Sequence, residues 1–250
     1  STDTIETNGL GAYFFSTWYD NRIGIDALLK YAEKKGLKRG VIIRPLDAGF
    51  WKFASDLMVA GAPARGITIV DDVHINNPLT TDYRTFISKA KAKNPDFIFF
   101  VTADPGECVF FKQMREQQLN IPVLATEAAG NNSSLEQCPE YLSNLYFSTP
   151  NPKHSGYQKF EKIFTEKYGR KPLFPSAVTA YDAVRVLASA LKKTGGVGGE
   201  ELQKALSATR NFSGASLPTI TFKENGFVIT PPNTFEMQTV KDGKFVTIPN

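Results

Sequence analysis

The fold is decided by the stretch NPDFIFFV at residues 94–101. Asn-Pro ends the preceding segment, and the apolar run that follows is typical of a strand buried on both faces. A helix is expected directly before it, over 82–93, because Phe86, Ile87 and Ala90 recur on one face. A helix that leads straight into a fully buried strand indicates a parallel sheet made of crossover connections.

The same alternation of helix and short apolar strand occurs three more times. Helices are expected over 23–35, 50–60 and 105–119, and strands over 40–43, 66–70 and 121–125. Repeated alternation of this kind predicts an α/β fold with a doubly wound parallel sheet, each face of which is covered by helices.

After Thr149-Pro150 the rhythm changes. Two long helices are expected over 154–168 and 176–193, with no strand between them, followed by a glycine-rich loop and a short helix. The tail shows the alternation and turn residues of antiparallel strands, over 219–222, 227–229, 235–240 and 245–248. This break marks a second structural unit, which looks incomplete because it lacks its own run of parallel strands.

Composition argues against two classes of protein. The 250 residues are 42% hydrophobic and carry a net charge of +4 from lysines spread along helices, which disfavours nucleic acid as a partner. No apolar run approaches the roughly 20 residues that span a bilayer. No leader precedes Ser1, so any export signal is expected to have been removed or to lie outside this sequence.

Cysteine and histidine give no metal motif. Cys108 and Cys138 are too far apart for a CxxC motif, so they form either one disulfide or two small buried apolar positions. His74 and His154 have no second ligand at helical spacing and are expected to be surface residues. We expect neither a metal nor another cofactor.

Enzyme motifs are also missing from the sequence. It contains no P-loop, no GxSxG elbow and no HExxH, and its Gly195 to Gly199 loop follows a helix rather than a strand. Neither histidine can be placed beside a cysteine nucleophile. These observations favour a non-enzymatic binder, although the sensory domain of a receptor has the same pattern of elements.

Four stretches carry a resemblance to a known family. They are Tyr13 to Thr17, Asn94 to Phe100, Thr179 to Val184, and Phe212 to Ala215 leading to Ile220 through Gly226. In this order and spacing the chain resembles the type I periplasmic solute-binding proteins, the branched-chain amino-acid-binding (Leu/Ile/Val) family of ABC transporters, without their N-terminal half-domain.

The resemblance implies a periplasmic binding protein type I fold of two lobes joined by three crossings. Residues 18–146 with 233–250 would form the C-terminal α/β lobe, and 1–17 with 147–232 would be a remnant of the N-terminal lobe. A periplasmic or other extracytoplasmic protein is implied, which binds an amino acid or similar amphipathic metabolite between the lobes, closes by a hinge and delivers it to a membrane permease. The alternatives are a binder of aromatic or aliphatic carboxylates and a receptor's sensory domain.

The resemblance also suggests which residues contact the ligand. Glu127 follows a strand at its carboxyl end, where open α/β sheets bind ligands, and it matches the acidic residue that pairs with the ligand ammonium. A desolvated ammonium needs such a charged acceptor. Ser1 and Thr2 match the end of the segment that holds the ligand carboxylate.

Other positions face the same expected cleft. Arg44 could clamp a carboxylate, or could be a surface residue paired with Asp47. Phe50 and Trp51 could pack on the ligand or in the core, and the same alternatives hold for Trp18. Two positions complete the expected set: Ala103, where relatives often have tyrosine, and Tyr181, on the helix that faces the hinge.

Overall fold

The computed structural model describes residues 11–46, 49–76, 80–101, 106–151 and 153–249. These residues form two compact units. Unit 1 contains Pro150–Thr234 and the described residues up to Asp20, and unit 2 contains Asn21–Thr149 with the described residues from Phe235 onward. The chain therefore passes between the units three times.

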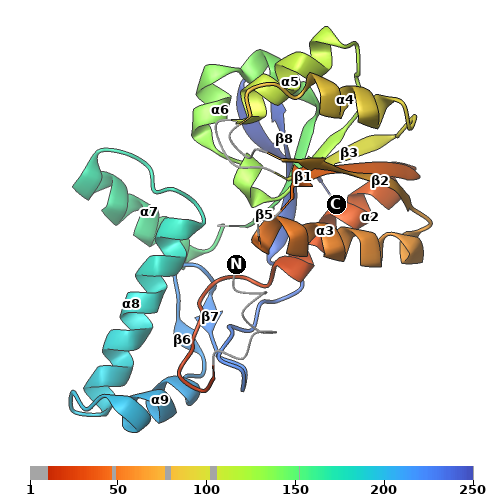
Figure 1. Cartoon of the computed structure of the whole chain (residues 1–250). Helices are drawn as coiled ribbons and strands as arrows, with labels where there is room; N and C mark the ends of the chain where they lie inside the picture. The colour runs from red at the N-terminus through yellow and green to blue at the C-terminus, as the bar shows by residue number, and fades with distance from the viewer. Residues whose placement is uncertain (1–10, 47–48, 77–79, 102–105, 152, 250) are drawn as a thin grey trace. The chain divides into compact units, whose positions relative to one another are not determined.

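Unit 2 is built on a seven-stranded sheet in the order β2-β1-β3-β4-β5-β8-β9 (Figure 1). The first five strands pair in parallel and β8 and β9 pair antiparallel. Their bounds are β1 Arg39–Pro45, β2 Thr68–Ile75, β3 Phe97–Phe100, β4 Val123–Ala125, β5 Leu145–Pro150, β8 Phe235–Lys241 and β9 Lys244–Thr247. The predicted α/β fold with a largely parallel sheet is thus confirmed.

Helices cover both faces of this sheet. Figure 1 shows α2 (Asn21–Lys34) and α3 (Gly49–Gly61) on one face and α4 (Arg84–Lys91) and α5 (Gly106–Glu116) on the other. Successive residues of β1 alternate between the two layers, as the period of a strand requires. Ile42 joins the core cluster of α2 and α3, whereas Val41 and Ile43 join the cluster of α4 and α5. This is the doubly wound arrangement.

A disulfide joins Cys108 to Cys138, with a Cα–Cα distance of 5.8 Å. It connects α5 to the residue before η3 (Pro139–Asn144), which follows the short segments η2 (Glu127–Ala129) and α6 (Asn132–Gln137). Of the two alternatives left open by the sequence, the structure shows the disulfide.

The described part of unit 1 contains helices and one short ribbon. It contains α7 (Ser155–Tyr168), α8 (Ser176–Lys193), α9 (Gly199–Ser207) and the antiparallel pair β6 (Phe212–Ser213) and β7 (Thr219–Ile220). The expected hairpin of 219–222 with 227–229 is reduced to β7 and an isolated bridge between Phe222 and Val228. Among the described residues, unit 1 has no parallel sheet of its own.

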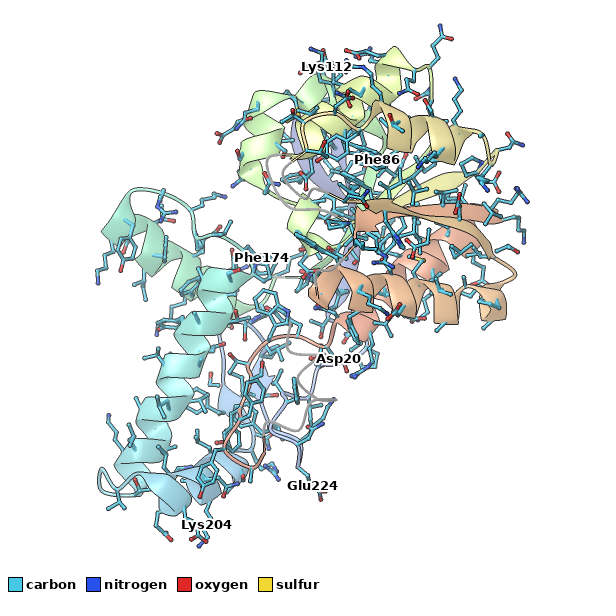
Figure 2. The ribbon with its side chains drawn as sticks, in the orientation of Figure 1. Asp20, Phe86, Lys112, Phe174, Lys204 and Glu224 are labelled. Atoms are coloured by element: carbon cyan, nitrogen blue, oxygen red, sulfur yellow. A yellow bond between two sulfur atoms is a disulfide. The ribbon has the colours of Figure 1, made fainter. Side chains whose placement is uncertain are left out.

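A small core holds the helices of unit 1 together. Phe174, labelled in Figure 2, packs edge-on against Tyr157 at 5.3 Å between ring centroids, and Phe160, Val178 and Ala215 belong to the same cluster. Each aromatic pair of this kind contributes about 1 kcal/mol beyond the area that it buries.

The buried Asp182 carboxylate fixes α8 to the loop after β6. It accepts hydrogen bonds from the backbone N–H groups of Ala215 and Ser216 and from the Ser216 hydroxyl, at 2.6 to 3.0 Å. Arg185 lies 3.2 Å away and supplies the opposite charge. A fully buried carboxylate is tolerated only with such partners, so Asp182 is a structural anchor of unit 1.

Candidate binding edge of unit 2

The carboxyl ends of β1, β3 and β4 lie side by side. Ile43 of β1 is in register with Phe100 of β3, and Phe99 is in register with Leu124 of β4. From β1 the chain goes first to β2 on one side and then to β3 on the other, so the strand order reverses at this place. The loops that follow such a reversal form the usual ligand site of an open α/β sheet.

Glu127 lies at this edge. It begins η2, two residues after β4 ends, and its side chain is partly buried. Its carbonyl accepts from the Gly130 N–H at 3.0 Å, which closes the turn. A side chain at Gly130 would come within 2.4 Å of the Phe147 ring on β5, so the loop can pack closely only with glycine there. These contacts fix the backbone that carries Glu127.

Arg44 has a different environment from either of those expected. It is 6% exposed and forms an ion pair with Asp72 on the neighbouring strand β2, with an Nη2–Oδ2 distance of 2.7 Å. Its Nε also donates to Asp72, and Nη1 donates to the carbonyls of Pro45 and Leu46. Nη2 also lies 3.0 Å from His74 Nε2. The expected surface residue is thus a buried one.

These contacts occupy the guanidinium. With His74 Nε2 as an acceptor, all five N–H donors of Arg44 have partners within the protein. Asp72 also lies 3.1 Å from His74, which the sequence had placed on the surface and which is about one third exposed. Asp47, the partner considered from sequence, lies outside the described residues. The arrangement supports a structural role for Arg44 rather than a ligand clamp.

Phe50 and Trp51 occupy the first turn of α3. Both are partly buried and pack against the core cluster of α2 and α3. The Trp51 carbonyl accepts from the Ser55 hydroxyl at 2.8 Å, which is a contact within the helix. Packing explains why aromatic residues stand here, and their contact with a ligand stays a prediction.

The remaining expected residues are not in unit 2 or are not described. Trp18 and Tyr181 belong to unit 1, where Tyr181 packs on Phe160 at 4.9 Å and lies below the Arg185 guanidinium. Ser1, Thr2 and Ala103 lie outside the described residues. Unit 2 therefore brings four of the expected residues to one sheet edge: Arg44, Phe50, Trp51 and Glu127.

The described residues offer neither a metal-ion cluster nor a membrane-spanning helix. They contain no group of three or more histidine, cysteine or acidic residues that could hold a metal ion. No helix among them is both long enough and apolar enough to cross a membrane.

Several solved structures have a similar fold. The leucine binding protein LivK of Thermotoga maritima has a TM-score of 0.79 and 24% identity, over 92% of this chain and 65% of that one. A solute binding protein of an R. palustris ABC transporter, solved with benzoate, has a TM-score of 0.79 and 19% identity, over 94% of this chain and 64% of that one. LivJ of Streptococcus pneumoniae, solved with isoleucine, has a TM-score of 0.80 and 20% identity, over 98% of this chain and 70% of that one.

The chain spans about 65% of the length of LivK and 64% of the R. palustris protein. No curated protein matches it. The sequence profile described as Periplasmic binding protein matches residues 2–244, which is nearly the whole chain. The chain therefore belongs to the periplasmic binding protein family, and it has the fold of the type I members.

Proposed function

We propose that this chain is part of the substrate-binding component of an ABC transporter and that its ligand is an amino acid or a similar small amphipathic metabolite. The observation that carries the proposal is the position of Glu127, directly after β4 at the reversal of strand order in a chain of this family. A carboxylate at that place is suited to a ligand ammonium.

The proposed mechanism is closure about a hinge. The three passages of the chain between units 1 and 2 are the connections about which two lobes could move. A ligand would first contact one lobe, and closure would then bury its charges and add contacts that exist only in the closed state. We propose that a membrane permease recognises the closed state.

We also propose that unit 1 is the incomplete remnant of an N-terminal lobe whose sheet is supplied by further chain. The support is an apolar face on α8, where Tyr181, Val184 and Leu187 are 40%, 66% and 42% exposed. A helix of a two-layer α/β lobe normally buries such a stripe against a sheet. The one-third of LivK that this chain does not span is consistent with this proposal.

For the ligand, a zwitterion is favoured over a simple carboxylate. LivK and LivJ are named for leucine and branched-chain amino acids, and the carboxylate alternative depended on Arg44. Because Asp72 and backbone carbonyls already accept its hydrogen bonds, Arg44 offers no obvious donor to a second carboxylate. Ser1 and Thr2 remain the proposed contacts of the ligand carboxylate, and a branched aliphatic side chain is the proposed specificity.

The test is leucine binding by calorimetry to the complete protein that contains this chain. Glu127→Gln keeps the shape of the side chain but removes its charge, so we expect leucine affinity to fall about 10- to 100-fold. Glu136→Gln, which changes an exposed acid on α6, is the matched control and should bind normally. Unchanged affinity in Glu127→Gln would remove the proposed ammonium contact.

The 250-residue chain alone provides a second measurement. We expect it to bind leucine weakly or not at all, because much of one wall of the proposed cleft is missing and the remaining contacts must still offset lost translational freedom. Micromolar binding by this chain would contradict the proposed division of the cleft.

A further inference from the structure

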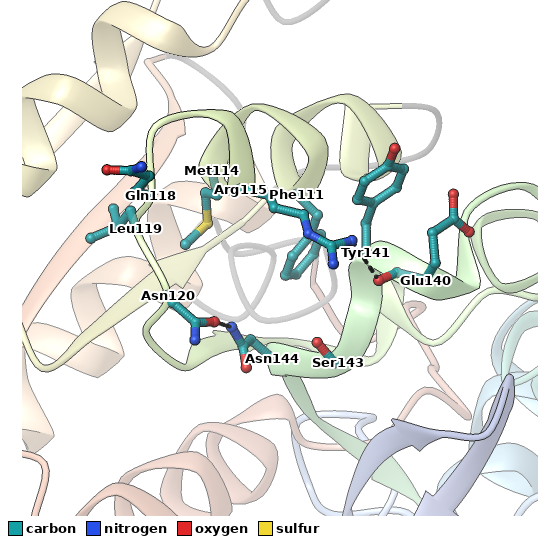
Figure 3. Close-up of a pocket in the computed structure, with 10 residues that line it drawn as sticks. All are labelled: Phe111, Met114, Arg115, Gln118, Leu119, Asn120, Glu140, Tyr141, Ser143 and Asn144. Atoms are coloured by element: carbon teal, nitrogen blue, oxygen red, sulfur yellow. Dashed lines mark hydrogen bonds between the residues drawn. The ribbon is translucent and has the colours of Figure 1, made fainter.

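A pocket of about 370 Å³ lies at the amino end of β4, away from the edge that carries Glu127. It is bounded by the end of α5, the loop before β4 and the end of η3 (Figure 3). Its apolar side is formed by Phe111, Met114 and Leu119, all of which are 9% exposed or less. The volume falls within the range of small-molecule sites.

The end of α5 explains how this pocket forms. Gln118 adopts the left-handed conformation with φ +55°, the Leu119 N–H donates to the Met114 carbonyl, and the Gln118 N–H donates to the Arg115 carbonyl. This is the Schellman pattern of helix ends, in which the residue after the left-handed one turns back to pack on the helix. It brings Leu119 into the pocket wall and satisfies the carbonyls of Met114 and Arg115.

The two walls are covalently linked. The disulfide from Cys108 of α5 to Cys138, just before η3, joins the elements that face each other across the pocket. On the lower rim the Asn144 amide donates to Asn120 Oδ1, which ties η3 to the loop before β4. A pocket held in this way loses little freedom when it is filled, which favours binding by even a small ligand.

Arg115 is the one positively charged residue among those that line the pocket. Arg115 is exposed, and its carbon Cζ lies 5.6 Å from the centre of the Tyr141 ring. Its hydrogen bond to the Glu140 carbonyl is 3.5 Å long and therefore weak, and no carboxylate among the described residues pairs with it. In Figure 3 the Glu140 carboxylate points away from the pocket, so its charge does not face the rim.

A second donor lies across the pocket from Arg115. The donor belongs to the amide pair of Asn120 and Asn144, which is joined by the bond from Asn144 Nδ2 to Asn120 Oδ1 (Figure 3). A guanidinium with no carboxylate partner among the described residues and an amide donor next to an apolar wall are complementary to a negatively charged acceptor that carries a hydrocarbon tail.

We propose that this pocket is a second binding site on the chain, separate from the edge that carries Glu127, and that it takes a small carboxylate with a branched aliphatic tail. The carboxylate contacts Arg115 beside the Asn120–Asn144 rim, and the tail contacts Met114, Phe111 and Leu119. The Arg115 charge weakens binding of an amine with the same tail. The proposal does not depend on what binds at Glu127.

The experiment is a titration of the ¹⁵N-labelled 250-residue chain, followed by NMR of the asparagine side-chain amides. The probe is 4-methylpentanoate, and 3-methylbutylamine has nearly the same tail with the opposite charge. We expect saturable shifts of the Asn120 and Asn144 amides with a Kd of about 1 to 10 mM for the carboxylate, which is typical of so few ligand atoms. The amine should bind at least about tenfold more weakly.

Variants locate the site. Arg115→Met keeps the length of the side chain and should weaken carboxylate binding at least about tenfold. Lys112→Met removes an equal charge from the outer surface of α5 (Figure 2) and should leave binding unchanged. Glu127→Gln should also leave it unchanged, which separates this site from the proposed function. No saturable shift up to about ten times that Kd, equal binding of the amine, or an unaffected Arg115→Met variant would each overturn the proposal.

Discussion

Removal of the Cys108–Cys138 disulfide should destabilise unit 2 by an amount that the loop length predicts. The two cysteines are 30 residues apart. In the chain-entropy description, closing a loop of that length lowers the entropy of the unfolded chain by about 12 cal/mol/K, or about 3.6 kcal/mol at 298 K. With a urea m-value of about 2.5 kcal/mol/M, the midpoint of unfolding should fall by about 1.5 M.

The two tryptophans allow unit 2 to be observed by itself. Trp18 lies in unit 1 and Trp51 in unit 2, so fluorescence in a Trp18→Phe background reports the unit that contains the disulfide. Urea unfolding of oxidised and reduced protein in that background compares the same side chains with and without the bond. The double variant Cys108→Ala with Cys138→Ala should unfold near the midpoint of the reduced protein.

Two outcomes would refute this reasoning. A shift below about 0.5 M at unchanged m would show that the unfolded chain gains little freedom when the bond is removed. A double variant much less stable than the reduced protein would show that packing of the sulfur atoms, rather than the cross-link, provides most of the stability.

Two further predictions concern single carboxylates. Asp182→Asn replaces acceptor oxygens with an amide that must face the N–H groups of Ala215 and Ser216, so it should destabilise unit 1 by about 2 to 4 kcal/mol, measured by urea unfolding with Trp18 as the reporter. The exposed Glu200→Gln is its control. Partial burial acts to raise the pKa of Asp26, but hydrogen bonds from Lys30 and Arg65 outweigh it and hold that pKa below 3.8. The stabilising contribution of the Asp26 carboxylate should therefore be present above about pH 4 and be lost as the pH falls through the lowered pKa. In Arg65→Met, an NMR titration should show the pKa of Asp26 moving up toward 3.8. An unmoved pKa would contradict the assignment of Arg65 as a cause of the shift.

The central sheet could be predicted because its strands are apolar and short. The run at 94–101 contains β3. The expected strand at 40–43 lies within β1, and the expected strand at 121–125 contains β4. Strand β2 was placed too early, over 66–70, whereas it runs through Thr68–Ile75. Asp71 and Asp72 make the second half of β2 look unlike a buried strand in the sequence. Their ion-pair partners, Lys93 and Arg44, lie in other parts of the chain and cannot be identified from the local sequence.

Helix ends show a second limit of prediction. The helix expected over 105–119 ends at Glu116, because Gln118 turns into the left-handed region. Glycine is the usual residue at such a position, and glutamine gives no sequence signal for it. The pocket at the end of α5 could not be predicted for the same reason, since its wall depends on this turn and on a disulfide whose pairing the sequence left open.

The chemistry of unit 2 resides in the loops at the two ends of its strands more than in the strands themselves. Strand β4 is only Val123–Ala125, three residues that are buried within the sheet. Its amino end comes after the loop of Asn120, beside the exposed Arg115, and its carboxyl end leads into Glu127. The two ends therefore carry groups of opposite charge at opposite edges of one sheet, which is why an anionic probe and an ammonium ligand are expected to select different places on the same unit.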